Sequence, residues 1–254
     1  MVFYFTGTGN SLYAAKKIED KPISIPQIIH NADLHFSEDT VGIVSPVYDH
    51  EVPPMVKEFL RKAAFHTDDF YMILTYGNRH GGAAELAKQL CEECGIDVRY
   101  INILWMADNW LPAFDMNEQK AIDKRVDGQI AAICADLSAR KAMIAPVTDA
   151  DRAAHQEYLN RIHQMPPDVF QHFIKVTDAC VGCGICEMVC PSGSIRVVGG
   201  KAVHTPGSCQ TCLACVHACP RKAIGLAVPE VNPNARYRNE HIALQELISA
   251  NRQA

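Results

Sequence analysis

Long apolar runs are missing from this sequence of 254 residues. No segment approaches the roughly eighteen consecutive apolar residues that mark a membrane-spanning helix. The short apolar start, residues 2–5, is followed at once by Thr6 and Gly7, so the basic and apolar segments of a secretory leader are missing as well. We therefore expect a cytoplasmic protein with no integral membrane segment.

Basic clusters are equally scarce. The chain has 24 Lys and Arg against 29 Asp and Glu, a net charge of −5, and no basic block extends beyond two or three residues. Proteins that bind nucleic acids usually concentrate Lys and Arg on one patch or helix. We expect no nucleic-acid partner. Because 48% of the residues are hydrophobic, intrinsic disorder is excluded, and the length suits one or two domains.

Cysteine, by contrast, is present in excess. Of the eleven cysteines, eight lie between Cys180 and Cys219, and the other three are Cys91, Cys94 and Cys134. Disulfide frameworks are typical of small secreted domains, whereas cysteines in a reducing compartment usually serve metal or redox chemistry. The uneven distribution divides the chain into two regions with different chemistry.

Residues 1–145 alternate short apolar runs with amphipathic helical patterns, which indicates a parallel sheet covered by helices. The pattern predicts an α/β fold with a doubly wound, parallel, five-stranded sheet. Strands are predicted at residues 2–5, 24–28, 41–45, 71–76 and 98–105, and helices after Asn10, after Pro54, at 83–94 and at 116–140, the last capped by Asp115.

Three further segments follow this first domain. Residues 146–172 have the pattern of a polar helical linker, which Pro166 and Pro167 interrupt. Residues 173–228 contain the eight clustered cysteines. Residues 229–254 are a tail, in which Leu244 and Leu247 indicate a short amphipathic helix.

The cysteine-rich segment repeats itself. Cys180, Cys183, Cys186 and Cys190 recur 29 residues later as Cys209, Cys212, Cys215 and Cys219, and a proline follows the last cysteine of each copy. Each copy has the spacing Cys-x2-Cys-x2-Cys-x3-Cys-Pro, which is typical of iron–sulfur proteins whose fourth cysteine binds the other cluster. The alternative is a pair of structural zinc sites, but these usually contain two Cys-x2-Cys pairs separated by a dozen or more residues.

Residues 174–228 resemble the bacterial-type ferredoxins with two 4Fe-4S clusters, at all eight cysteines and both prolines. The resemblance implies a small α+β dicluster domain that transfers single electrons. Exchange of the fourth ligands assigns Cys180, Cys183, Cys186 and Cys219 to the first cluster, and Cys209, Cys212, Cys215 and Cys190 to the second.

A glycine-rich loop lies between the first predicted strand and the first predicted helix. It contains Thr6, Gly7, Thr8, Gly9, Asn10 and Ser11. Backbone N–H groups at the start of a helix attract anions, so a phosphate is the expected ligand, although the pattern also suits a plain tight turn. The loop has neither the Lys of a Walker A motif nor the third glycine of a dinucleotide fingerprint. Its hydroxyl groups are the candidate phosphate donors.

Other candidate side chains follow the third, fourth and fifth predicted strands, whose carboxyl ends share one edge of the sheet. Together with the first loop they resemble flavodoxin, in which a Thr-x-Thr-Gly-Asn-Ser/Thr pattern binds the FMN phosphate. The resemblance covers about residues 1–145. It implies an FMN site made of Thr6, Gly7, Thr8, Gly9, Asn10 and Ser11 at the phosphate, and of Pro46, Val47, Tyr48, Tyr76, Gly77 and Asn78 at the isoalloxazine ring.

For several other cysteines and histidines, the sequence favours an ordinary structural role over a redox or proton-transfer role. Cys91 and Cys94 are expected to be core or half-exposed thiols of a helix, and Cys134 a small buried residue. His217 is expected to be a solvated loop residue, with tuning of a cluster as the alternative. For His50 and His80, in loops near the predicted flavin, an ordinary loop role is expected, with proton delivery as the alternative.

The whole chain resembles flavodoxin–ferredoxin fusion proteins. The sequence thus predicts an electron-transfer protein with FMN and two 4Fe-4S clusters as cofactors, and with a redox partner protein or a small redox substrate. Two alternatives remain open. One is a flavin-dependent reductase of a small quinone-like substrate fed through the clusters, and the other is an iron–sulfur sensor or binding protein with an empty flavodoxin-like scaffold. The sequence predicts neither the direction of electron flow nor the oligomeric state.

Overall fold

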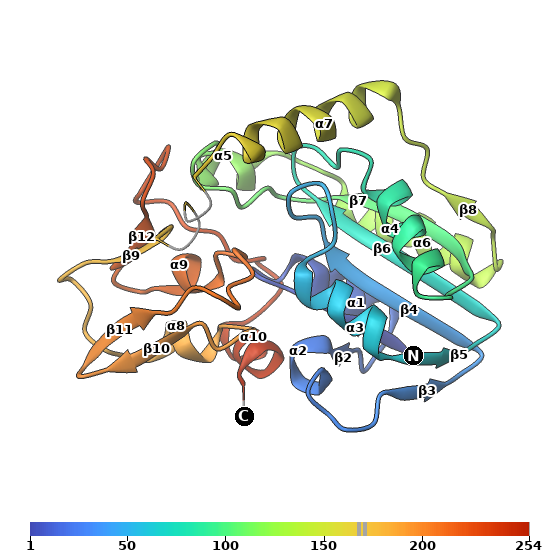
Figure 1. Cartoon of the computed structure of the whole chain (residues 1–254), viewed down its shortest axis with the longest axis horizontal. Coiled ribbons are helices and arrows are strands. Elements are labelled where there is room, and N and C mark those ends of the chain that lie inside the picture. Colours follow the sequence, from blue (N-terminus) through green and yellow to red (C-terminus); the bar gives the residue numbers. More distant parts are fainter. Residues whose placement is uncertain (167–168, 170–171, 254) are drawn as a thin grey trace.

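The first region of the chain folds around one parallel sheet. The computed structural model describes residues 1–166, 169 and 172–253, and Figure 1 shows the sheet beside a smaller C-terminal region. Six strands pair in the order β2-β1-β4-β6-β7-β8, and each neighbouring pair is parallel. The strands are β1 (Val2–Tyr4), β2 (Ile23–Ser24), β4 (Thr40–Pro46), β6 (Asp69–Tyr76), β7 (Val98–Trp105) and β8 (Met143–Ile144).

This strand order confirms the predicted doubly wound α/β fold. The chain places β2 on one side of β1 and β4 on the other, which creates the switch point at which such sheets bind ligands. The prediction of five strands was wrong by one, because β8 adds an edge strand that pairs with Tyr100 and Ile101 of β7. Its two residues are too few to produce a periodicity signal.

The main helices pack against the sheet where the amphipathic patterns predict them. They are α1 (Asn10–Ile18), α3 (Pro54–Lys62), α4 (Ala83–Glu93) and α6 (Val126–Ser138). α1 contacts β1, β4 and α6, and α4 contacts β7 and β8. A short parallel pair, β3 (His35–Ser37) with β5 (Ala64–His66), brings Phe36 and Phe65 onto Phe3 of the core, with ring centroids 4.6 and 6.1 Å away.

Two predicted elements were wrong in detail. Residues 24–28 do not continue β2 but enter α2 (Ile25–Ile28), because Pro26 offers no N–H to a sheet and its fixed φ suits a first helical turn. The helix predicted at 116–140 is divided into α5 (Met116–Ala121) and α6, since Arg125 between them has a left-handed φ of 46°. Asp115 caps α5 as predicted, by accepting a hydrogen bond from the Asn117 N–H.

The cysteine-rich region forms a small α+β unit, as predicted. Its elements are β9 (Ile174–Val176), α8 (Ile185–Met188), β10 (Ile195–Val198), β11 (Lys201–His204), α9 (Ala214–Ala218) and β12 (Ile224–Leu226). β9 pairs antiparallel with β12, so the first and last strands of the region meet, and β10 and β11 form a hairpin. α8 and α9, one from each sequence copy, contact each other.

The duplication extends from the cysteines to the backbone conformation. Left-handed residues recur at the spacing of the cysteines: Gly182 and Thr211, Gly184 and Leu213, and Gly193 and Lys222. Each is a glycine in the first copy, where a positive φ is free of strain, whereas the second copy has side chains at these positions. The shape of the ligand loops therefore imposes this conformation against local preference.

The two copies should respond differently to a methyl group at the first of these positions. A Cβ on Gly182 would lie 2.3 Å from the carbonyl oxygen of Gly200, whereas Thr211 already carries a side chain. We expect Gly182→Ala to destabilise the protein by roughly 2 kcal/mol or more and Thr211→Ala to leave it near wild type. Thermal unfolding followed by circular dichroism under anaerobic conditions measures both. Equal unfolding temperatures for the two variants would contradict the contact.

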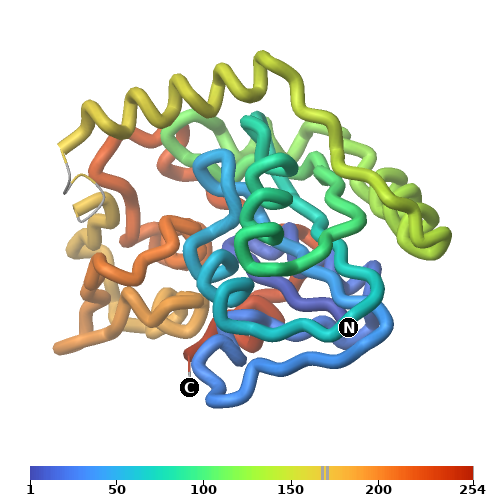
Figure 2. Tube along the Cα trace, turned by 45° about the vertical axis from the view of Figure 1, so that its right-hand side comes forward, coloured from blue at the N-terminus to red at the C-terminus, as the bar shows by residue number. Residues whose placement is uncertain are grey.

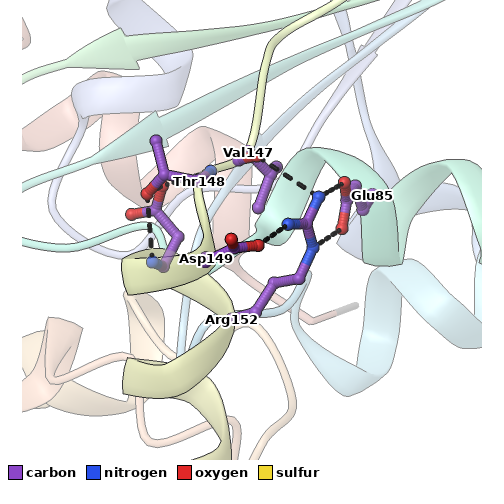
Figure 3. A network of polar contacts seen from close by, with 6 residues as sticks. Glu85, Val147, Thr148, Asp149 and Arg152 are labelled. Atoms are coloured by element: carbon purple, nitrogen blue, oxygen red, sulfur yellow. Dashed lines mark hydrogen bonds and ion pairs between the residues drawn. The ribbon is translucent and has the colours of Figure 1, made fainter.

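A long surface helix connects the two regions. Figure 2 shows α7 (Asp149–His163) extending from the sheet region toward the cysteine-rich region, and none of its residues is fully buried. At its start, Thr148 and Asp151 form a capping box. Arg152 donates to both carboxylate oxygens of Glu85 on α4 and to Asp149 (Figure 3). The segment expected as a linker is thus fastened to α4 at its start; its break at Pro166 and Pro167 lies partly outside the described residues.

The C-terminal tail returns to the sheet. Its helix α10 (Leu244–Asn251) contacts α2 of the first region and α8 of the second. Leu247 and Ile248 are buried, and the Ser24 hydroxyl donates to the Ala250 carbonyl. The tail therefore joins the two regions. Within the described residues, none of the helices is long and apolar enough to span a membrane.

Candidate functional site

The first predicted set of cluster ligands surrounds one pocket. Cys180, Cys183, Cys186 and Cys219 line it together, although Cys219 belongs to the second sequence copy. Burial raises the pKa of the Cys186 thiol to about 11, and the neighbouring Cys219, Cys183 and Cys180 add to this effect. The structure thus brings the exchanged fourth cysteine to the three cysteines with which it was predicted to act.

The second predicted set gathers in the same way. Burial raises the pKa of Cys215 well above its ordinary value, and Cys212, Cys190 and Cys209 lie close enough to raise it further. Here too the fourth cysteine, Cys190, comes from the other copy. Both sets offer four thiols in a compact region, which is the donor set that a 4Fe-4S cluster requires.

Backbone N–H groups donate to sulfur atoms of both cysteine sets. The Ser194 N–H donates to Cys190 Sγ and the Ala223 N–H to Cys219 Sγ, both at 3.2 Å, so the duplication preserves this bond as well. The Ala202 N–H donates to Cys180 Sγ at 3.4 Å and lowers the pKa of that thiol. Such bonds favour the thiolate, which is the form that binds iron.

A second pocket lies at the switch point of the sheet. It is lined by Thr6, Gly7, Thr8, Asn10, Ser11, Pro46, Val47, Tyr48, Thr75, Tyr76, Gly77, Asp108 and Asn109. Ten of the twelve residues predicted to bind FMN are among them, while Gly9 and Asn78 lie outside the lining. The three loops that the sequence expects to converge therefore do so.

The first loop presents free donors at this pocket. Gly9 adopts a left-handed φ of 102° and its N–H donates to Thr6 Oγ1, which closes the loop. Within the described part of the chain, the N–H groups of Gly7, Thr8 and Asn10 have no hydrogen-bond acceptor. The start of α1 adds its positive dipole end. This arrangement suits a phosphate, and none of the pocket-lining residues is a Lys or Arg that would otherwise balance its charge.

Hydroxyl groups add further polar contacts. Ser11 Oγ shares a hydrogen bond of 2.9 Å with Thr75 Oγ1, and Thr8 Oγ1 accepts from Asn109 Nδ2 at 3.1 Å. The hydroxyls of Thr6 and Thr8 act as acceptors in these bonds, so each retains a hydrogen to donate. The pocket residues thus fit the phosphate of FMN.

The two loops that were predicted to flank the isoalloxazine ring, residues 46–48 and 76–78, have different environments. The hydroxyl of Tyr48 is buried against the first loop and the Cys212 segment, which raises the pKa of this phenol well above its ordinary value. Tyr76 instead packs edge-to-face on His80, with ring centroids 5.2 Å apart. The Gly77 carbonyl accepts from Trp105 Nε1.

Sequence reasoning missed an acidic side chain at the ring end of the pocket. Asp108 accepts from the N–H groups of Asn78 and Trp110 at 2.9 and 2.8 Å, and burial raises its pKa. The signal was its position just beyond the last residue of β7, where ligand-binding side chains of such sheets gather. Thr75, near the end of β6, and Asn109, in the loop after β7, also line the pocket and were not assigned to the site from the sequence.

The C-terminal tail also contributes to the first loop, which the sequence did not reveal. Tyr237 Oη and Asn239 Nδ2 both donate to Asn10 Oδ1, at 2.6 and 3.1 Å, and the Asn239 N–H donates to the Thr8 carbonyl. Tail residues separated from the loop by more than two hundred positions leave no local pattern. They hold Asn10 in a fixed orientation.

The expectation for His217 was wrong. The side chain is buried rather than solvated: its Nε2 bonds the Asn109 carbonyl at 2.9 Å, and its Nδ1 accepts from the Tyr237 N–H at 3.0 Å. Burial lowers the pKa of the imidazole to about 4. His217 therefore connects the cysteine-rich region, the loop after β7 and the tail.

The three cysteines outside the clusters lie away from both pockets. Cys91 is buried on α4, where its thiol contacts Met72 Sδ, and Cys94 at the end of that helix is half-buried. Both match the expectation of structural thiols. Cys134 was expected to be buried, but it is only half-buried. Its sulfur lies near the Lys17 carbonyl oxygen, at the surface between α6 and the end of α1.

Three histidines meet beneath α7. The His50 ring lies 5.6 Å from that of His155 on α7, and burial lowers the pKa of both. The Nδ1 atoms of His50, His80 and His155 are buried without a hydrogen-bond partner among the described residues. His80 Nε2 lies 3.6 Å from Asp151 of the same helix. The packing of α7 thus requires neutral imidazoles at His50 and His155.

Acidification should therefore loosen α7. Below about pH 6.5 the unfolded chain takes up protons at His50 and His155 that the folded chain does not, so the stability present at neutral pH declines as the pH falls toward their lowered pKa values. Arg79, His80 and Arg161 oppose a charge on His50 further. The protection of the amides of residues 149–163 against hydrogen exchange, corrected for the pH dependence of the intrinsic exchange rate, should fall between pH 7.5 and pH 5.5, and less so in His155→Gln. Equal pH dependence in both proteins would contradict this cause.

Comparison with known proteins identifies the cysteine-rich region. Residues 172–220 match the family described as a 4Fe-4S dicluster domain. The chain is 49% identical over 47 residues to a component of the ion-translocating oxidoreductase complex of Methanosarcina acetivorans, a match that covers 18% of each protein. It is 34% identical over 71 residues to a component of the F(420)H(2) dehydrogenase of Methanosarcina mazei, covering 22% of this chain and 19% of that protein.

Two further comparisons concern a shorter relative and the fold. A putative electron transport protein, YsaA of Escherichia coli, is 34% identical over 59 residues, or 21% of this chain and 38% of that protein. The matches thus span less than two fifths of each of these three relatives. The solved structure of the Trp repressor binding protein from Bacillus subtilis aligns with 54% of this chain and 96% of its own, at a TM-score of 0.35 and 14% identity. By the family match and by the topology of its sheet, the chain carries a C-terminal 4Fe-4S dicluster domain after a doubly wound α/β region.

Proposed function

We propose that this protein transfers electrons between FMN in the switch-point pocket, two 4Fe-4S clusters on the eight cysteines, and a redox partner. The observation that carries the proposal is the contact between the two sites. Gly7 and Tyr48 of the pocket lie against Cys212, a predicted ligand of the second cluster. Electron transfer through protein is fast only over short distances, so this contact gives the cofactors a direct route.

The relatives support the iron–sulfur part of the proposal. Their names describe components of an oxidoreductase complex and of a dehydrogenase, and an electron transport protein, and their similarity falls on the cysteine-rich region. The flavin part depends on the pocket: a switch-point position, free N–H donors and hydroxyl groups at one end, and two aromatic loops at the other.

The residues of the pocket would bind and orient the flavin. The N–H groups of Gly7, Thr8 and Asn10 and the hydroxyl of Thr6 would hold the phosphate, while residues 46–48 and 76–78 would flank the ring. When bound, FMN supplies the conversion between two-electron and one-electron chemistry. Tyr48 and the tail pack on the loop and would keep water from the route to Cys212.

Cofactor analysis of one anaerobic preparation tests this function. We expect about one FMN per chain, with iron and acid-labile sulfide near eight each. Clusters without FMN would favour the iron–sulfur sensor with an empty scaffold, and zinc without sulfide would exclude the cluster assignment. Mixing the reduced protein with small quinones distinguishes a carrier from a reductase, since a carrier shows no selective oxidation by one of them.

A further inference from the structure

The two cysteine sets differ in their position relative to the switch-point pocket. The first set reaches the surface: Cys183 is exposed and the adjacent Val181 is 63% exposed. Its pocket is lined only by residues between 180 and 224, within the cysteine-rich region. In the second set, Cys190 and Cys212 are only 8% and 9% exposed.

Three contacts seat the second set on the first region. A Cβ on Gly7 would lie 2.7 Å from the Cys212 carbonyl oxygen and 2.6 Å from Tyr48 Oη, so these groups are closely packed. Asn251 Nδ2 donates to the Thr6 carbonyl at 3.0 Å and to the carbonyl of Val189, the neighbour of Cys190, at 3.2 Å. Each of these two contacts links a ligand loop to a pocket loop.

The third contact lies beside Cys209. Gln210 Oε1 accepts from the Met55 N–H of α3 at 2.9 Å. The second set is thus held against the first region by residues 189, 210 and 212, each within one position of a predicted ligand or identical to it. A cluster on this set would therefore adjoin Gly7 and Tyr48 of the pocket.

We propose that the two clusters form an ordered relay, in which the first is the external port and the second the internal link to the pocket. A one-electron carrier protein docks at the Val181 to Cys183 loop, loses one electron and reduces the first cluster by one electron. The same electron passes to the second cluster and then to the pocket. Two such transfers, with protons from solvent, supply a full two-electron reduction there. The relay rests on the proposed FMN site at its inner end.

The surface around Cys183 suits a protein carrier. Gly182 packs closely on Gly200 at the turn of the β10–β11 hairpin, which brings the loop beside Val198, itself 63% exposed. Exposed apolar side chains next to a cluster ligand provide the contact area that brief protein docking needs.

The port is tested with reduced bacterial two-cluster ferredoxin as a protein-sized donor and dithionite as a small one. Val181→Asp should slow cluster reduction by the ferredoxin about tenfold or more and leave reduction by dithionite unchanged. Val231→Asp, at a valine 56% exposed outside the port, is the matched control and should behave as wild type. A wild-type rate in Val181→Asp would overturn the port.

The inner link is tested by electron paramagnetic resonance of the two reduced clusters. Tyr48→Leu should shift the signal and midpoint potential of one cluster, and Val181→Asp those of the other. If both variants perturb the same cluster, or if Tyr48→Leu perturbs neither, the relay order is wrong. FMN content is measured separately in the same samples, so a preparation with both clusters but no FMN contradicts the proposed function and still tests the order of the clusters.

Discussion

Replacing Cys219 should remove the first cluster and leave the second. We expect the iron content of Cys219→Ala to fall from about eight to about four per chain under anaerobic conditions. The physical reason is that Cys219, although close in sequence to Cys215, lies in the pocket of Cys180, Cys183 and Cys186. Iron and sulfide analysis measures the loss.

Double variants identify which cluster has been lost. Adding Cys186→Ala to Cys219→Ala should cause no further loss of iron, because both residues serve the same pocket. Adding Cys215→Ala should remove the remaining iron, because Cys215 lies with Cys190, Cys209 and Cys212. Ligation within each sequence copy would give the opposite pattern. Cys134→Ala, outside both sets, is the control and should retain the full iron content.

A methyl group at Gly7 should abolish FMN binding. The added Cβ would lie 2.6 Å from Tyr48 Oη and 2.7 Å from the Cys212 carbonyl, so the first loop must move away from both. The loop would then lose the N–H geometry that holds the phosphate, and we expect at least about a hundredfold weaker binding, equivalent to about 2.7 kcal/mol. Titration of FMN into flavin-free protein with intact clusters measures the dissociation constant.

The control for this prediction is a glycine with free space. Gly128→Ala, on α6, places its methyl group where no atom lies within 4 Å, and should leave FMN affinity unchanged. Thr6→Val should have an intermediate effect, about tenfold or more, because it removes one candidate phosphate donor and the acceptor of the Gly9 N–H but adds no clash with Tyr48 or Cys212. Wild-type affinity in Gly7→Ala would contradict the placement of the phosphate.

Most of the sheet was predictable because its long strands are rich in apolar, β-branched and aromatic residues. β4, β6 and β7 lie within two residues of their predicted bounds. The failures have local physical causes: Pro26 stops a sheet from continuing, Arg125 adopts a left-handed conformation inside an apolar stripe, and β8 is too short to give a pattern.

In the candidate site, too, some residues are recognisable from the sequence and others only from the structure. The sequence reveals Thr6, Thr8 and the eight cysteines, because a phosphate loop or a cluster-binding loop requires these residue types at these short spacings. Asp108 and Asn109 are visible only by position at the end of a strand. Tyr237 and Asn251 carry no sequence signal at all, since their role is to contact residues more than two hundred positions away.

The sequence by itself determined the eight clustered cysteines, their division into two copies, the hydroxyl-rich loop and the class of the sheet, because short-range spacing and periodicity encode all four. Only the tertiary structure decided that Cys212 lies against Gly7 of the first loop while Cys183 is exposed, and that His217 is buried between the two regions. The two sequence copies are nearly equivalent in spacing, so nothing within them distinguishes an inner from an outer cluster. The packing of the tail and of the first region against one copy makes that distinction.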